Sequence, residues 1–166
     1  ILLDLLTIDK NNLHGRTELA KIYQFQRKHD QAEKVLLDLL TIDKNDLQAR
    51  TELAKIYQFQ RKYDQAEKVL LESLAIDPMN FHAMAELIAV YDKTNQPDRC
   101  FQVLDAFLQN ACVEKRREPQ AMFNNICRLC SKHDRPDKAE EYFHNYSDVL
   151  DPRNISLFGR CFGFHQ

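Results

Sequence analysis

The chain has 166 residues, of which 44% are hydrophobic and 29% charged, a composition typical of a soluble folded domain rather than a disordered one. Lysine and arginine number 23 against 25 acidic residues, so the net charge of −2 lacks the strongly basic balance of a dedicated nucleic-acid-binding domain. Three glycines and five prolines leave few turn signals for a β-protein, so the composition predicts an all-α fold.

The compartment is predicted from the apolar runs and the cysteines. Acidic residues interrupt each apolar run within a few positions, so no run is long enough to cross a bilayer. The five cysteines lack the spacing of a disulfide framework, which favours a reducing compartment and predicts a cytoplasmic protein. The sequence starts inside an apparent helix and without Met, so we interpret it as an excerpt of a longer array.

The strongest feature of the sequence is an internal repeat with an offset of 34 residues. Residues 1–34 and 35–68 differ at only five positions, namely Ile1/Val35, Asn12/Asp46, His14/Gln48, Gly15/Ala49 and His29/Tyr63. A period of this length predicts a stacked helical array rather than one closed globule.

Each repeat is predicted to form two helices. Apolar side chains recur at three- and four-residue spacing, in the first full repeat at Leu19, Ile22 and Tyr23 and then at Ala32, Leu36 and Leu39. Asp30 lies between these two sets and is placed to cap the second helix. Because one helix pair cannot bury both of its apolar faces, we expect stability to come from the stacking of neighbouring pairs.

A family resemblance is clearest in the second repeat, in Leu53-Ala54, Tyr57, Tyr63-Asp64, Ala66, Leu70 and Asp77-Pro78. As a set, these residues resemble the signature of the tetratricopeptide repeat, a helix-turn-helix unit of 34 residues. The sequence departs from that signature where Arg16 and Arg50 replace an aromatic residue and Leu39 replaces a small one. The resemblance implies a right-handed α-solenoid of stacked antiparallel helix pairs, with about ten helices in all.

We expect residues 1–166 to form a single solenoid domain built from these repeats. The predicted divisions are a half-unit at 1–12, units at 13–46, 47–80, 81–114 and about 120–154, and a half-unit at 155–166. The boundary Asn110–Pro119 is longer than the others and predicts an extended loop or a lengthened helix end. The segment Ile155–His165 is too apolar for a solvating cap, so it is expected to dock inward, bind a partner or expose a sticky end.

The sequence contains one motif with metal or redox spacing, Cys127-Arg128-Leu129-Cys130, but no second cysteine pair completes a four-ligand zinc site. In the repeat alignment its cysteines occupy the packing positions of Ala20 and Tyr23, so we interpret them as buried structural thiols. No histidine can be paired with a nucleophile, and no phosphate-binding glycine loop occurs. We therefore predict a non-enzymatic protein without a metal or a cofactor.

The binding prediction concerns the polar strip on the first helix of each repeat. In the resembled family this strip faces a concave groove, which implies that it receives a peptide or a partner helix. Lys21 and Lys55 would be neighbouring cations there, for acidic or carbonyl groups, although a solvated face is the alternative interpretation. The candidate ligand-binding residues are Thr17, Lys21, Gln24, Thr51, Lys55, Gln58, His82, Asn124 and Arg128.

The leading functional prediction is a protein-interaction scaffold with a protein or peptide partner. One subgroup of the family clamps a terminal carboxylate with Lys, Asn, Asn, Lys and Arg, but Thr17 and Thr51 stand at the first of those places, which disfavours that mode. One alternative is a homo-oligomer that stacks end to end through Ile1 and Ile155–His165. Another is RNA binding, because Ala121–Asp151 loosely resembles a pentatricopeptide unit, but the acidic balance makes nucleic acid an unfavoured partner.

Overall fold

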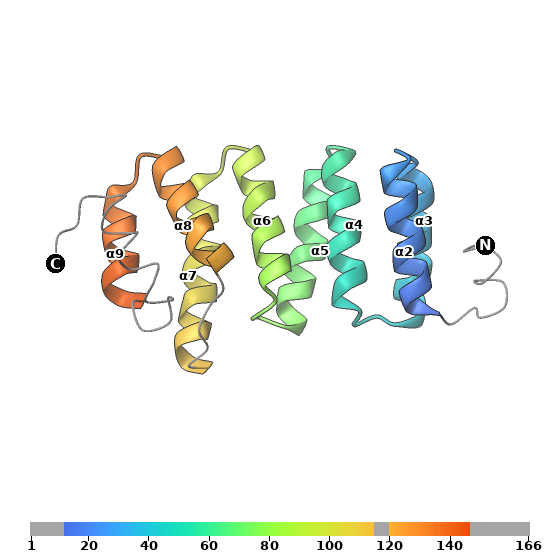
Figure 1. Ribbon diagram of the computed structural model, residues 1–166, viewed down its shortest axis with the longest axis horizontal. Coiled ribbons are helices and arrows are strands. Elements are labelled where there is room, and N and C mark those ends of the chain that lie inside the picture. Colours follow the sequence, from blue (N-terminus) through green and yellow to red (C-terminus); the bar gives the residue numbers. More distant parts are fainter. Residues whose placement is uncertain (1–11, 115–119, 147–166) are drawn as a thin grey trace. The chain divides into compact units, whose positions relative to one another are not determined.

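The computed structural model describes residues 12–114 and 120–146, and all regular structure within them is α-helical (Figure 1). The helices are α2 (Leu13–Phe25), α3 (His29–Ile42), α4 (Leu47–Phe59), α5 (Tyr63–Ile76), α6 (Phe81–Lys93), α7 (Pro97–Glu114), α8 (Gln120–Lys132) and α9 (Pro136–Tyr146). The all-α prediction is confirmed, with eight helices over these residues where about ten were expected for the whole chain. Both predicted half-units lie outside the described residues, except for Asn12. None of the described helices is long and apolar enough to cross a membrane.

The chain divides into two compact modules, an N-terminal module (Ile1–Val90) and a C-terminal module (Tyr91–Gln166). In the N-terminal module, α2 packs against α3 and α4 packs against α5. Helix α4 also packs against α2 and α3, which links the first repeat (residues 13–46) to the second (residues 47–80). In the C-terminal module, α8 packs against both α7 and α9. The helix pair is therefore the packing unit, as the repeat predicts.

The first helix of each of the first three repeats begins after a side chain that caps it. The Asn12 Oδ1 accepts a hydrogen bond from the Gly15 N–H at 2.7 Å, and the Asp46 Oδ1 accepts one from the Ala49 N–H at 2.8 Å. Asn80 makes the same contact with the Ala83 N–H at 3.0 Å. Each cap satisfies a backbone donor that the first helical turn leaves without a partner. The 34-residue period of these caps sets where the first helices start.

The second helices begin differently from the prediction. Helix α3 starts at His29, its N-cap is Lys28, and no side chain makes a capping hydrogen bond there. The prediction that Asp30 caps this helix is wrong, because Asp30 lies within the first helical turn. Its carboxylate is still favourably placed at the positive end of the helix dipole, and it accepts a hydrogen bond from the Gln60 Nε2 at 3.1 Å.

Left-handed residues join the two helices of each pair. They are Arg27, Arg61, Asn95 and Asp134, with φ of 60°, 59°, 56° and 50°. In the first repeat, the Arg27 N–H donates to the Gln24 carbonyl at 2.9 Å and the Lys28 N–H donates to the Tyr23 carbonyl at 2.8 Å. This pattern is a Schellman motif, which normally places glycine at the left-handed position. A residue with a Cβ atom is sterically strained in this conformation, so each of the four turns is locally unfavourable in energy.

The core repeats with the same period as the sequence. Leu19 and Leu53 are 6% and 1% exposed at equivalent places in α2 and α4. Ala32, Ala66 and Cys100 are fully buried at one equivalent place in α3, α5 and α7. Each buried leucine contributes roughly 1.5–3 kcal/mol before conformational entropy is counted. Stacked pairs thus share one continuous set of packing positions within each module.

Candidate functional site

A pocket of about 470 Å³ lies in the N-terminal module, on the first half of α4 and at the start of α6. The lining residues are Leu47, Gln48, Thr51, Glu52, Lys55, Asn80 and His82. The five residues from α4 follow three- and four-residue steps, so they share one face of that helix. The volume falls within the range of clefts that hold small ligands, and it suits one or two side chains of a peptide.

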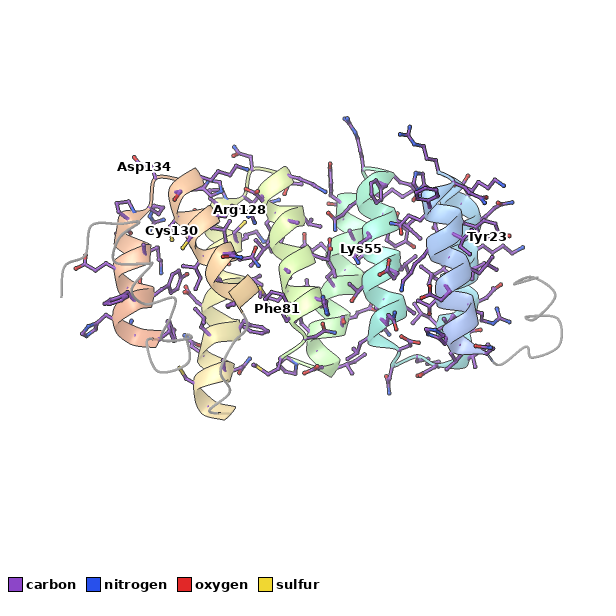
Figure 2. All side chains as sticks on the ribbon, in the orientation of Figure 1. Tyr23, Lys55, Phe81, Arg128, Cys130 and Asp134 are labelled. Atoms are coloured by element: carbon purple, nitrogen blue, oxygen red, sulfur yellow. The ribbon has the colours of Figure 1, made fainter. Side chains whose placement is uncertain are left out.

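Several polar groups of this pocket are already engaged. Figure 2 shows Lys55 on α4, and its Nζ lies 3.0 Å from the Glu52 Oε1, with 34% of the lysine side chain and 13% of the glutamate side chain exposed. The Thr51 hydroxyl donates to the Leu47 carbonyl at 2.8 Å, within its own helix. The Asn80 amide caps α6 and donates to the Ser73 Oγ at 3.4 Å. These side chains therefore form the walls of the pocket, and most of their polar groups already have a partner within the protein.

Two side chains of the pocket remain available for a ligand. Gln48 and His82 are exposed, and neither makes a hydrogen bond to another residue in the described part of the chain. The His82 ring meets the ring of Phe81 edge-on, with centroids 6.0 Å apart. The pocket thus presents an amide, an imidazole and an ion pair around an apolar wall from Leu47. Such a lining suits the backbone and polar side chains of a peptide.

The structure brings three of the predicted site residues to this pocket, Thr51, Lys55 and His82. The other predicted residues of the N-terminal module, Thr17, Lys21, Gln24 and Gln58, are not in its lining. Thr17 is buried and donates to the Leu13 carbonyl at 3.2 Å, and Lys21 pairs with Glu18 at 2.8 Å. Gln58 is only 7% exposed. Its Nε2 donates to the Glu86 Oε2 at 2.7 Å.

The remaining predicted residues, Asn124 and Arg128, lie on α8 in the C-terminal module, where both are exposed. Figure 2 shows Arg128 on this helix. The Arg128 guanidinium lies 2.9 Å from the Asp92 carboxylate, which also accepts from Lys132 at 2.7 Å and lies 3.1 Å from the His133 Nε2. Burial alone would raise the pKa of Asp92, but the hydrogen bonds from Lys132, Arg128 and His133 outweigh burial and hold this pKa below its ordinary value. One carboxylate thus gathers three basic side chains.

The sequence analysis did not predict several residues of the pocket on α4 and of the basic cluster around Asp92. Gln48 and Glu52 line the pocket with Lys55 because they lie on the same face of α4, and this spacing was readable from the sequence. Asn80 could be recognised only as a helix cap. Lys132 lies one turn after Arg128, so it could have been grouped with it by the same rule. The spacing of His133 in the sequence did not indicate that it would lie beside Asp92.

The cysteines of the predicted metal-like motif differ in burial. Cys130 is buried and Cys127 is partly buried. Burial raises the pKa of Cys130 to about 12 and that of Cys100 to about 11, so both are neutral thiols near neutral pH. Within residues 12–114 and 120–146, no group of three or more His, Cys, Asp or Glu side chains could hold a metal ion.

Comparison with known proteins finds a family match for part of the chain. Residues 26–89 match the family model for the tetratricopeptide repeat. A search of the curated proteins finds no match. Similar solved structures include MamA, at 16% identity and a TM-score of 0.65 over 96% of this chain and 87% of that one.

Two further structures have a similar fold. YrrB, described as a TPR protein with an unusual peptide-binding site, is 14% identical, with a TM-score of 0.63 over 96% of this chain and 82% of its own. PilF of Pseudomonas aeruginosa is 16% identical, with a TM-score of 0.62 over 96% of this chain and 71% of its own. At these identities the similarity establishes a common helical repeat fold and no more.

Proposed function

Since residues 26–89 match the family model for the tetratricopeptide repeat, we propose that the chain is a non-enzymatic scaffold that binds a peptide or a partner helix along the first helix of each repeat. The observation that carries this proposal is the pocket on α4, which gathers Thr51, Lys55 and His82 from the predicted strip. The peptide-binding site named for YrrB supports it by analogy of fold. Repeat proteins of this kind use such extended surfaces for binding.

The chemistry of the pocket favours the peptide backbone as the main ligand group. A carboxylate of the ligand would have to compete with Glu52 for Lys55, since these two side chains already form an ion pair. A backbone carbonyl can accept from Lys55 without displacing Glu52, because the ammonium group has three donors. The exposed Gln48 can pair with a backbone amide in the same way. We therefore expect an extended segment with uncharged side chains at this position.

The proposal is tested with random peptides displayed on phage and selected on the full chain. Lys55→Ala and His82→Ala are expected to weaken the selected peptides by roughly tenfold or more, because a hydrogen bond to a charged group contributes about 1.5–3 kcal/mol. Lys68→Ala is the matched control, since Lys68 is exposed on α5 and does not line the pocket. Equal losses in all three variants, or in none, would place binding elsewhere.

The other interpretations stay predictions. End-to-end self-assembly depends on Ile1 and on Ile155–His165, which lie outside the described residues. RNA binding depends on Ala121–Asp151, of which the structure describes residues up to 146. No contact among the described residues favours either of them over peptide binding, and the cytoplasmic location also stays a prediction.

A further inference from the structure

Helix α8 carries positive charge and no negative charge. Among the eight described helices it alone contains neither aspartate nor glutamate, and Arg128 and Lys132 are its two cations. These two residues lie four positions apart, so they share one face of the helix with Ser131. All three side chains are exposed. That face therefore presents a guanidinium, a hydroxyl and an ammonium group, each of which donates hydrogen bonds.

The first helices of the first two repeats neutralise the equivalent cation within the helix itself. Their ion pairs are Lys21 with Glu18 and Lys55 with Glu52, in which the acid stands three residues before the lysine. In α8 the corresponding residues are Arg128 and Asn125, so a neutral amide replaces the acid. The charge of Arg128 is therefore not balanced within its own helix.

Asp92 balances only part of the positive charge on this face. Its carboxylate is shared between the Arg128 guanidinium at 2.9 Å and the Lys132 ammonium at 2.7 Å. Among the described residues, no other acidic side chain pairs with either cation. Two cations against one carboxylate leave one positive charge in excess, even while the neighbouring His133 ring is neutral.

The two cations are still open to a ligand. The side chains of Arg128 and Lys132 are 45% and 51% exposed, whereas that of Asp92 is 12% exposed. Each cation makes one hydrogen bond to Asp92. Since a guanidinium has five N–H donors and an ammonium has three, donors are left for a second acceptor. A second carboxylate fits best, because charge-assisted hydrogen bonds are strong and one negative charge balances the excess.

We propose that Arg128, Ser131 and Lys132 form a binding site for a glutamate or aspartate side chain of a protein partner. The two cations donate to its carboxylate, and the Ser131 hydroxyl supplies a further donor beside them. One excess charge matches one carboxylate, whereas RNA gains its affinity from many phosphate contacts. The site is separate from the pocket on α4, and it rests on the proposed function only in taking a protein as the partner.

The probe is an acetylated and amidated pentapeptide with three central glutamates, compared with the same peptide carrying three glutamines. Both are titrated into the ¹⁵N-labelled full chain at constant ionic strength, because salt screens exposed charges. The glutamate peptide should shift the side-chain Nε signal of Arg128 and the backbone signal of Ser131. The glutamine peptide should bind roughly tenfold more weakly or less, because hydrogen bonds to charged groups are stronger than those to neutral ones.

Matched variants test the two cations. Arg128→Gln and Lys132→Gln should each weaken the glutamate peptide by roughly tenfold, whereas Arg128→Lys keeps the charge and should lose less. Ser131→Asp leaves both cations in place but adds a competing carboxylate to the same face, so it should also weaken binding. Lys68→Gln, which changes an exposed lysine of α5, should have no effect. Lys55→Ala should have none either, so failure here is distinct from failure at the pocket.

Three results would overturn the proposal. The first is that the two peptides do not differ, whether both bind or neither does, because no carboxylate is then recognised. The second is that Lys68→Gln weakens the glutamate peptide as much as Arg128→Gln, which would reduce the effect to general charge attraction. The third is that an RNA of eight uridines shifts the Arg128 and Ser131 signals while the glutamate peptide does not, because the ligand would then be phosphate groups of RNA.

Discussion

Helices α2 and α4 share one sequence from Arg16 to Phe25 and from Arg50 to Phe59, yet they are buried differently. Helix α4 packs against the preceding pair α2 and α3 and against its own partner α5. Among the described residues, α2 packs against its own partner α3 and against α4 of the next repeat, and against no helix that precedes it. Burial in this array is therefore set by neighbours, and identical residues acquire different energetic roles.

Local features behave in the opposite way, because they are the same in both copies. The hydroxyls of Thr17 and Thr51 donate to the carbonyl four residues earlier. Lys21 and Lys55 each pair with the glutamate three residues before, at 2.8 and 3.0 Å. Contacts within one helix thus follow from sequence alone, whereas contacts between helices depend on position in the stack.

The largest expected effect is a difference between two identical substitutions. Ile56→Ala should cost about 2–4 kcal/mol of unfolding free energy, because it leaves a cavity at a 1% exposed site. Ile22→Ala should cost less than about 1 kcal/mol, since that side chain is 42% exposed. Equilibrium urea unfolding of both variants measures the two losses. Equal losses would show that α2 is covered in solution as fully as α4.

A second expected effect concerns Tyr57, which is 6% exposed and lies beside Glu33. Burial and the negative charge of Glu33 raise the pKa of Tyr57 above its ordinary value. The folded state thus favours the neutral phenol, so this contribution is present in full below the ordinary pKa. It is lost as the pH rises from there through the raised pKa.

The matching variants are Tyr57→Phe and Tyr23→Phe. At neutral pH the first should cost about 1 kcal/mol or less, because it removes only the hydroxyl of a buried side chain. It should also make the loss of stability at alkaline pH less steep. The second should change stability by less than about 0.5 kcal/mol, as is usual for a partly exposed side chain. Urea unfolding at a series of pH values measures both, and identical alkaline slopes for Tyr57→Phe and the unchanged chain would contradict the assignment.

The smallest expected effect is the same in both copies. Arg27→Gly and Arg61→Gly should each stabilise the chain by about 0.5–1 kcal/mol, because glycine adopts φ near 60° without a Cβ clash. The residues are both exposed, so no packing is removed. Thermal unfolding should show similar gains for the two variants. A gain at one turn only would mean that the turns, like the cores, depend on neighbouring repeats.

The 34-residue period predicted the starts of the first helices because a side-chain cap precedes each of them, at Asn12, Asp46 and Asn80. The start of α3 was misplaced because it follows from the left-handed backbone of Arg27 and not from a capping side chain. Such a turn is hard to read without a glycine.

The candidate site was only partly predictable, because sequence spacing shows which residues share a helix face and not what lies opposite. Gln58 shares the strip of Lys55, but Glu86, 28 residues further along, accepts its hydrogen bond. Ile22 shares the apolar pattern of Ile56, but the helix end that covers Ile56 has no counterpart at α2 among the described residues. Both outcomes depend on contacts between repeats, which periodicity alone does not specify.

The left-handed turns also place an identical protease site in both copies, because each left-handed arginine is followed by a lysine. Arg27 and Lys28, like Arg61 and Lys62, are exposed at the end of a first helix. The N–H of Lys28 and that of Lys62 are each bound to a carbonyl at 2.8 Å, so trypsin can cut there only after the turn opens. The relative rates of cleavage at the two turns, measured in one digestion, therefore compare the free energies of local opening of the two repeats.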